Sequence, residues 1–225
     1  MKRILSKVGI VLTLLCIIVN MNASCTNKEA TQKTNAQTSE ANEISEENME
    51  CSCPRATILL VPYGNFTVKE AQTLKAELGP KLNDMAYGIW KIDVGKPQAL
   101  EQSWYYSPRN RYRADRIIHS LNARTKGDTV RIALTHKDVS TSVHGQKDFG
   151  IMGLSYRPGR AAVVSTFRLK RHSDLWKVTM HEFLHSMGWP HCPKDDPHCI
   201  MQDAHGRNTF SQKNGLCKGC KEQIG

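Results

Sequence analysis

Apolar residues after position 55 recur with two spacings, alternating in some segments and lying three or four apart in others. The first spacing is typical of half-buried strands and the second of helices with one buried face. From these spacings we expect, in chain order, a strand over 56–61, a helix from the capping box at Thr67 to about Leu78 that ends at Gly79 and Pro80, a strand over 87–94, a helix over 109–123 and a strand over 130–134. Strands separated by single helices favour a mostly parallel sheet with crossover helices.

The second half of the pattern predicts a hairpin followed by one more helix. Strands are expected over 149–156 and 161–169, and the Arg-Pro-Gly-Arg turn at 157–160 should make them antiparallel. Ser173 and Asp174 can cap the helix that follows. The predicted fold class is therefore α/β, with a mixed sheet, two crossover helices and a third helix near the end of the domain.

The first 53 residues differ in composition from the rest. A basic start and an apolar run over 8–19 predict a signal peptide over 1–24, and the run is too short to span a membrane comfortably. Ala23-Ser24-Cys25 is similar to the bacterial lipobox, so we expect Cys25 to be lipidated. The polar stretch over 25–53 predicts a flexible linker that tethers a domain over 54–225 to the membrane of the cell envelope. A secreted or periplasmic soluble protein, with Cys25 incidental, is the alternative.

The charge of the chain constrains its partners. Its 225 residues include 31 Lys and Arg against 21 Asp and Glu, a formal net charge of +10. This excess indicates either a solvated basic surface or a preference for acidic peptides, anionic lipid or polyanions. Because no basic run is interleaved with aromatic residues, we expect no nucleic acid partner. The length fits one ordinary domain, and we expect a monomer.

The last predicted helix carries the residues with the clearest chemistry. Its sequence over 181–185 is His-Glu-x-x-His, and the chain continues to Gly188 and His191. His181 and His185 lie one turn apart on one helix face, so both rings can reach a single ion. A glycine lets the chain leave the helix in a conformation that other residues resist, and His191 can then return as a third ligand. Three protein ligands leave a fourth position open, which is typical of a catalytic zinc.

Four cysteines follow the third histidine, at Cys192, Cys199, Cys217 and Cys220. In an exported protein, cysteines usually form disulfides, so two bridges are one expectation. The other is a structural zinc, because the last two cysteines have the Cys-x-x-Cys spacing of a zinc clasp and four thiolates saturate a tetrahedral ion. From the residues alone, both expectations stay open.

The motif as a whole resembles a known family. His-Glu-x-x-His-x-x-Gly-x-x-His with a methionine downstream is the pattern of the metzincin peptidases. A cysteine directly after the third histidine, then Cys-x-Met and a final Cys-x-x-Cys, is similar to the archaemetzincins, although the spacing between the cysteines departs from their usual one. The resemblance implies two zinc ions per chain, one catalytic and one structural, Met201 in a turn beneath the catalytic ion, and an edge strand near 149–155 that binds substrate.

The resemblance also implies a reaction. Glu182 is the expected general base, taking a proton from a zinc-bound water as that water attacks a peptide carbonyl. The predicted function is zinc-dependent hydrolysis of peptide bonds, with endopeptidase and aminopeptidase action both open. A non-catalytic, zinc-stabilised module that only binds peptides is the alternative, and the presence of Glu182 favours the enzyme. Some metzincins have an oxyanion-assisting tyrosine two residues after the turn methionine, where this chain has Asp203.

Overall fold

The computed structural model of this chain describes residues 56–85, 90–143 and 145–223. The predicted signal peptide, Cys25 and the linker lie outside these residues, and so does the start of the strand expected over 87–94. Across the described ranges, no helix combines the length and the apolar character needed to cross a bilayer.

A five-stranded sheet, in the order β2-β1-β5-β9-β8, organises the domain. Its strands are β1 (Ala56–Pro62), β2 (Trp90–Val94), β5 (Thr129–Thr135), β8 (Gly153–Ser155) and β9 (Ala161–Ser165). The first four in spatial order pair in parallel, and β8 pairs antiparallel with β9. The predicted mixed sheet is confirmed, and β8 forms one of its edges.

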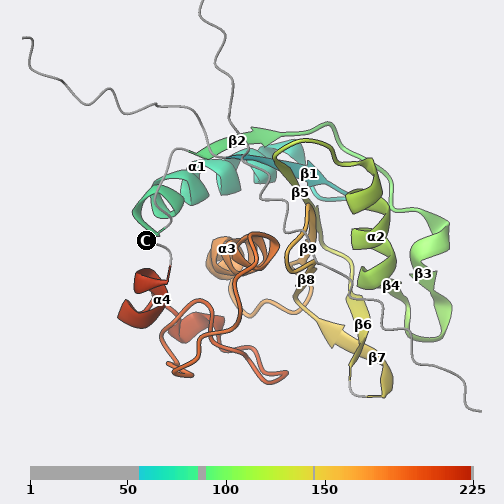
Figure 1. Ribbon diagram of the computed structural model, residues 1–225. Helices are drawn as coiled ribbons and strands as arrows, with labels where there is room; N and C mark the ends of the chain where they lie inside the picture. Colours follow the sequence, from blue (N-terminus) through green and yellow to red (C-terminus); the bar gives the residue numbers. More distant parts are fainter. Residues whose placement is uncertain (1–55, 86–89, 144, 224–225) are drawn as a thin grey trace, which may run out of the picture. The chain divides into compact units, whose positions relative to one another are not determined.

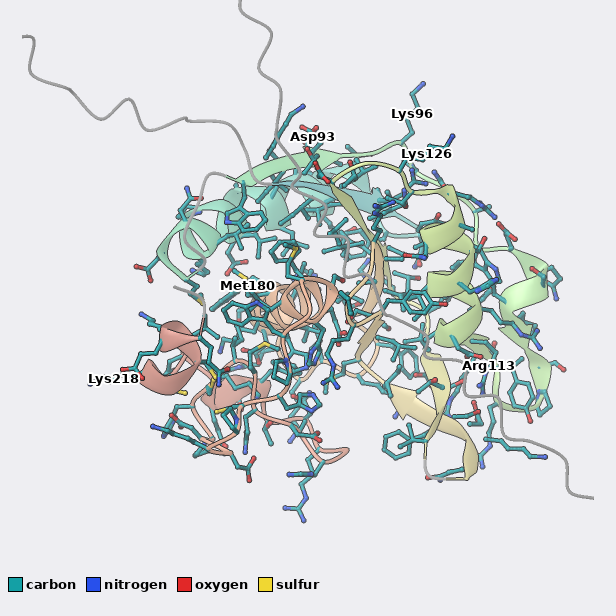
Figure 2. The ribbon with its side chains drawn as sticks, in the orientation of Figure 1. Asp93, Lys96, Arg113, Lys126, Met180 and Lys218 are labelled. Carbon is teal, nitrogen blue, oxygen red and sulfur yellow. The ribbon has the colours of Figure 1, made fainter. Side chains whose placement is uncertain are left out.

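Three helices cover the two faces of this sheet. As Figure 1 shows, α1 (Val68–Met85) and α3 (Leu175–Ser186) lie on one face, and α2 (Ala114–Arg124) lies on the other. Successive strand side chains point to opposite faces, so Ile132 packs in the cluster with α1 and α3 while Ala133 packs with α2. Figure 2 shows Met180 of α3 inside this packing, whereas Lys96 and Lys126 project away from it.

The predicted end of the first helix is wrong. Helix α1 continues through Gly79 and Pro80 to Met85. Proline removes one helical hydrogen bond and costs about 3 kcal/mol inside a helix. Leu82 and Met85 are both buried against the core, and burying each contributes about 1.5–3 kcal/mol. Packing of the extra turns therefore offsets the local cost of the proline.

The predicted start of the second helix is also wrong, because α2 begins at Ala114 rather than near Arg109. The segment before it forms a 3-10 turn ending at Asn110, whose φ of 50° lies in the left-handed region, and then a short strand β4 (Arg111–Arg113). Left-handed backbone interrupts a helix. The chain therefore turns and extends before α2 starts.

A second sheet, which the sequence pattern did not indicate, lies beside the first and is ordered β3-β4-β6-β7. Its members are β3 (Tyr105–Tyr106), β4, β6 (Val139–Val143) and β7 (Gln146–Ile151). The single strand expected over 149–156 is therefore divided at Met152: β7 pairs with β6 in this sheet, and β8 pairs with β9 in the first. The antiparallel hairpin across 157–160 is confirmed, although β9 ends at Ser165 rather than at residue 169.

The chain after α3 is mostly loop. It includes a 3-10 turn at Phe210–Gln212 and the short helix α4 (Lys218–Glu222), and it packs below α3 in the view of Figure 1. Ile200, Met201 and Phe210 of this region join the same core cluster as α1 and α3.

Candidate metal centre

Helix α3 and the loop after it bring the three predicted histidines together. The Nε2 atoms of His181 and His185 lie 3.1 Å apart. The ring of His191 has its centroid 5.5 Å from that of His181 and 4.7 Å from that of His185. One ring nitrogen from each of the three lies within 4.8 Å of the others. Gly188 has a φ of +99°, the left-handed conformation that was expected to redirect the chain.

Hydrogen bonds fix which nitrogen of each helical histidine carries its proton. Nδ1 of His181 donates to the carbonyl of Ile200 at 2.8 Å, and Nδ1 of His185 donates to the carbonyl of Trp189 at 2.6 Å. A carbonyl oxygen can only accept, so both Nε2 atoms of the neutral rings present lone pairs to one another. Two lone pairs at 3.1 Å repel unless a cation lies between them. The donor set therefore fits a metal ion.

Asp203 provides the corresponding partner for the third histidine. Its Oδ2 lies 3.5 Å from Nδ1 of His191. A carboxylate behind a ligating imidazole orients the ring and makes it a better ligand. Asp203 occupies the position at which some metzincins have a tyrosine, and no sequence signal indicated that it would lie beside His191.

The three rings are neutral at pH 7. Burial, with a smaller effect from His185, lowers the pKa of His181 to about 3. Burial also lowers the pKa of His185 to about 4 and lowers that of His191. Because only neutral imidazole binds a metal ion, these shifts prepare the rings as ligands.

Strand β8 holds the carboxyl group of Glu182. Ser155 donates its hydroxyl to Oε2 at 2.9 Å, and Oε1 would lie 2.5 Å from a Cβ placed on Gly153. Burial raises the pKa of Glu182 to about 8, and the bond from Ser155 acts in the opposite direction. A cation among the histidines would likewise lower that pKa through its charge. The sequence indicated an edge strand near 149–155, but not the contacts of Gly153 and Ser155 with Glu182, which depend on the register of β8.

Ser155→Ala should lower kcat for peptide hydrolysis about tenfold, because a hydrogen bond to a charged group holds the base in place. Metal content and KM should stay near those of the unchanged protein, and Ser155→Thr should restore part of kcat. Ser186→Ala is the matched control, because Ser186 donates to the main-chain carbonyl of Glu182 rather than to its carboxyl group. Equal losses in the Ser155→Ala and Ser186→Ala variants would contradict a role in positioning the base.

The histidines and Glu182 lie in one cleft with a cavity volume of about 1100 Å³. Residues 149–155, from β7 and β8, line one side, and the loop over 202–208 lines the other. This volume slightly exceeds the range of small-molecule pockets, about 300–1,000 Å³. The cleft is therefore large enough for a peptide segment.

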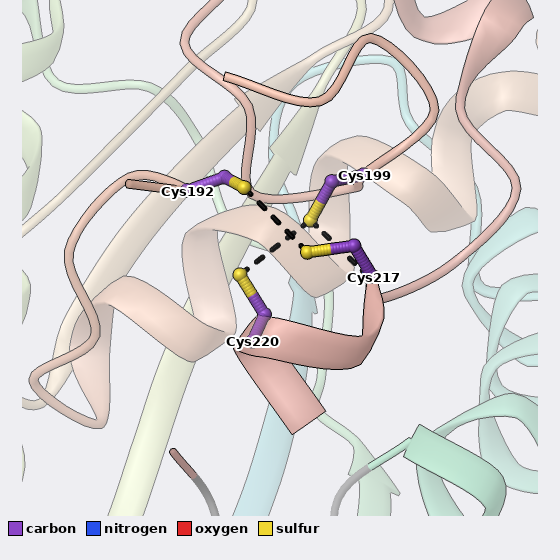
Figure 3. Close-up of side chains that lie close together, drawn as sticks. All are labelled: Cys192, Cys199, Cys217 and Cys220. Carbon is purple, nitrogen blue, oxygen red and sulfur yellow. Dashed lines mark hydrogen bonds between the residues drawn. The ribbon is translucent and has the colours of Figure 1, made fainter. Parts of the chain in front are cut away.

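The four predicted cysteines form a second group, shown in Figure 3. Sγ of Cys192 lies 3.6 Å from Sγ of Cys217, and Sγ of Cys199 lies 3.7 Å from Sγ of Cys220. A disulfide would need about 2.05 Å, whereas ligands at about 2.3 Å from a tetrahedral ion are about 3.8 Å apart. The four thiols are free. Their arrangement fits a metal ion and does not fit the two disulfides that remained open.

If these thiols are ionised, the negative charge of the thiolates needs a nearby cation. Burial raises the pKa of Cys199 and of Cys220, and the neighbouring thiols raise the latter further. Against the effect of burial, the backbone N–H groups of Asp196 and Lys194 lower the pKa of Cys192. Four thiolates this close cannot all be ionised without a cation among them.

One backbone segment, 199–202, joins the two groups. Cys199 contributes its sulfur to the cysteine group, and the carbonyl of Ile200 accepts the hydrogen bond from His181. The next carbonyl, that of Met201, accepts a hydrogen bond of 2.7 Å from the backbone N–H of Cys192. The Met201 side chain is completely buried in the core cluster. A displacement of this segment would therefore disturb both groups.

A buried lysine, Lys213, binds both ends of the segment 199–202. Nζ of Lys213 donates to the carbonyls of Cys199 and Gln202 at 3.1 and 2.9 Å, and the residue has no exposed surface. Burial lowers its pKa. The ammonium group satisfies carbonyls that a loop would otherwise leave unpaired in the interior.

Comparison with known proteins identifies relatives that match most of the domain. No family model matches the chain. An archaemetzincin from Halobacterium salinarum is 28% identical over 150 residues, which cover 60% of this chain and 83% of the relative. An archaemetzincin from Haloquadratum walsbyi is 25% identical over 183 residues, 73% of this chain and 97% of the relative. Over most of its domain, this chain is therefore similar to archaemetzincins.

Solved structures of archaemetzincins have the same fold. The crystal structure of an archaemetzincin from Methanopyrus kandleri superposes with a TM-score of 0.65 at 22% identity, covering 76% of this chain and 93% of the other. A zinc-dependent peptidase from Methanocorpusculum labreanum superposes with a TM-score of 0.60 at 18% identity, covering 75% of this chain and all of the other, at 100%. This chain thus shares its mixed α/β fold with both proteins.

Proposed function

We propose that this chain is a zinc metallopeptidase that hydrolyses peptide bonds in the cleft between β8 and the loop over 202–208. The observation that carries the proposal is the convergence of three neutral imidazoles beside a buried glutamate. His181, His185 and His191 would hold the ion. Nδ1 of each of the first two donates to a carbonyl, that of Ile200 or Trp189, and Nδ1 of His191 lies 3.5 Å from Asp203. When bound, zinc supplies a Lewis acid that polarises a carbonyl and lowers the pKa of water toward about 7.

Glu182 then acts as the general base. Its carboxylate accepts the proton of the attacking water and afterwards passes that proton to the nitrogen of the leaving amine. Ser155 keeps Oε2 in place during both transfers, and the absence of a side chain on Gly153 leaves room for Oε1. Because the carboxyl group is buried, its interaction with the reacting atoms is little screened by solvent.

The free edge of β8 is proposed to align the peptide. β8 is the last strand of the five-stranded sheet, and only one of its sides pairs with β9. A peptide added as a further strand would gain main-chain hydrogen bonds and present alternate side chains to the cleft. This placement brings a peptide bond next to Glu182, since the carboxyl group contacts both Gly153 and Ser155 of the same strand.

The cysteine group is proposed to hold a second, structural zinc, giving two ions per chain. Four sulfurs leave no open position on a tetrahedral ion, so this ion would not take part in hydrolysis. Met201, buried next to the segment shared by both groups, is proposed as the turn methionine that supports the histidine rings by packing.

Incubation with a mixed peptide library tests this function. We expect cleavage products by mass spectrometry, their loss after treatment with a chelator, and their return when zinc is added back. Chelation that removes the zinc and leaves the rate of cleavage unchanged would contradict the proposal. Peptide binding without any cleavage would favour a non-catalytic module instead.

The envelope tether is a separate part of the proposal. It rests on the signal-like segment over 1–24, the Ala23-Ser24-Cys25 boundary and the polar linker. Fractionation of cells that produce the full chain tests it, because a lipidated Cys25 should place the protein with the membranes.

A further inference from the structure

The arginine Arg168 lines the same cleft as Glu182. Arg168 lies against Gly150 of β7, whereas Glu182 lies against Gly153 of β8. Arg168 follows β9 and lines the same cleft as the histidines. Its Nε and Nη2 donate to the two carboxylate oxygens of Asp138 at 2.7 and 2.8 Å. Within the described parts of the chain, its Nη1 has no hydrogen-bond partner. About a third of the side chain, 32%, is exposed.

The guanidinium group is held rigidly. A Cβ on Gly150 would lie 2.2 Å from both Cζ and Nη2 of Arg168, so only glycine allows the group to lie against this strand. Asp138, in turn, accepts a hydrogen bond of 2.7 Å from Nε of Arg111, whose Nη1 donates to Asp148 at 2.9 Å. These four side chains form a ladder of alternating charges that runs from the cleft into the second sheet. An arginine fixed in this way loses little conformational entropy when it binds a ligand.

The ladder carries more positive than negative charge. Nε of Arg109 lies 3.8 Å from Asp148, so three guanidinium groups face two carboxylates. Both carboxylates are nearly buried, with 8% and 10% of their side chains exposed. The network therefore carries one unbalanced positive charge, and Arg168 is the one of its three arginines that lines the cleft.

The position of Arg168 relates it to the scissile bond. Gly150, against which Arg168 lies, precedes Gly153, against which Glu182 lies, by three residues. Extended chain rises about 3.3 Å per residue and this chain bends at Met152, so the two points are at most about 10 Å apart. Arg157, at the other end of β8, lies near His185 and His191, since its charge lowers the pKa of both rings after the larger effect of burial. On a peptide bound along β8, Arg168 would therefore lie on the β7 side of the scissile bond and Arg157 on the opposite side.

We propose that Arg168 forms an anion subsite that binds a carboxylate of the peptide within about three residues of the scissile bond, on the side toward β7. The proposal rests on the peptidase function of the cleft. The carboxylate is either an acidic side chain or the terminal carboxylate of the peptide, since the planar guanidinium recognises both in the same way. Nε and Nη2 of Arg168 are already paired with Asp138, so Nη1 is the donor that such a carboxylate would meet.

The test uses quenched fluorescent peptides that differ only by Glu against Gln at each position around the cleaved bond, each made as a free acid and as an amide. For the full chain we expect kcat/KM to be about tenfold higher when the carboxylate occupies the β7 side. Arg168→Gln should reduce this ratio to near one. The free acid and amide arms show which carboxylate is bound. Arg157→Gln and Arg207→Gln are matched controls, because each also removes a cation that lines the cleft. Both variants should keep the ratio of kcat/KM values, since Arg168 is still present.

A ratio measured within one variant is independent of how much of that variant is folded or active. Binding of the same peptides to the Glu182→Gln variant, followed by fluorescence anisotropy, gives the ratio of Kd values without any hydrolysis. If the unchanged protein cleaves no peptide, the peptidase function fails and the anisotropy still decides whether the subsite exists. Equal Glu/Gln ratios in the full chain and in Arg168→Gln, in both assays, would overturn the subsite.

Discussion

Glu182→Gln should lower peptide hydrolysis by about 10²- to 10⁴-fold while the protein stays folded and keeps its zinc. The size of the loss is that expected when a general base is removed. Glutamine has the same shape, so it can still accept the hydrogen bond from Ser155 and still fits against Gly153. The amide, however, cannot take a proton from water. Metal content should not change, because Glu182 lies beside the ligands and is not one of the three that converge.

The measurement is kcat/KM on one cleaved peptide, with zinc determined by elemental analysis and the fold by circular dichroism. Glu77→Gln is a matched control, because Glu77 lies on α1 and does not line the cleft. We expect that control to hydrolyse the peptide at the unchanged rate. A Glu182→Gln variant with near-normal turnover would exclude the mechanism, and one that loses zinc would mean that the carboxyl group contributes to metal binding.

Cys217→Ser should remove one of two zinc ions, lower the midpoint of thermal unfolding by about 10 °C and reduce hydrolysis at least about tenfold. Serine cannot supply a thiolate, so three sulfurs would be left to hold the ion. The effect should reach the histidines through the segment 199–202, in which Ile200 binds His181 and Met201 binds the N–H of Cys192. Cys217 itself does not line the cleft, so a loss of activity would have to be transmitted.

The control for this variant is Lys218→Ala, which changes the adjacent and highly exposed residue, with 91% of its side chain accessible, without removing a sulfur. Zinc content, thermal unfolding and hydrolysis are measured on both variants. A Cys217→Ser protein that loses one zinc but unfolds and hydrolyses peptides as before would show that the second ion does not clasp the loop. A starting protein with a single zinc and no titratable thiols in this region would favour disulfides.

The sequence predicted the parts of the fold in which local pattern and tertiary packing agree. β1, β5 and α3 follow from their apolar runs, and α3 in particular carries the histidine spacing that located the metal group. The predicted cap of α3 is wrong, because the Asp174 side chain makes no capping hydrogen bond and pairs with Arg171 and Lys177 instead. The second sheet could not be predicted, because β3 and β4 have two and three residues and contain mostly tyrosine and arginine. Such short strands show no clear alternation. They are stabilised by distant partners, such as Asp138 for Arg111.

The residues of the candidate site likewise fall into those that the sequence identified and those that it did not. Its histidines, Glu182 and cysteines lie in one continuous motif, so their spacing along the chain was enough to identify them. Residues that reach the site from other elements have no such signal. Ser155 is 27 residues away from Glu182, and the contact depends on how β8 pairs with β9. Asp203 reaches His191 only because the loop over 202–208 folds back over the cleft.

The contact between Gly153 and Glu182 has a consequence for how activity can be lost in such a protein. A single methyl group at residue 153 would lie within 2.5 to 2.8 Å of three atoms of the glutamate side chain. The carboxyl group is buried and has little room to move aside, so the methyl group would displace it from the hydroxyl of Ser155. Every metal ligand would remain in place. A related chain with a larger residue at this position could thus keep the complete His-Glu-x-x-His motif and a metal-bound site and still be inactive. The cause would be one substitution on a neighbouring strand, outside the motif.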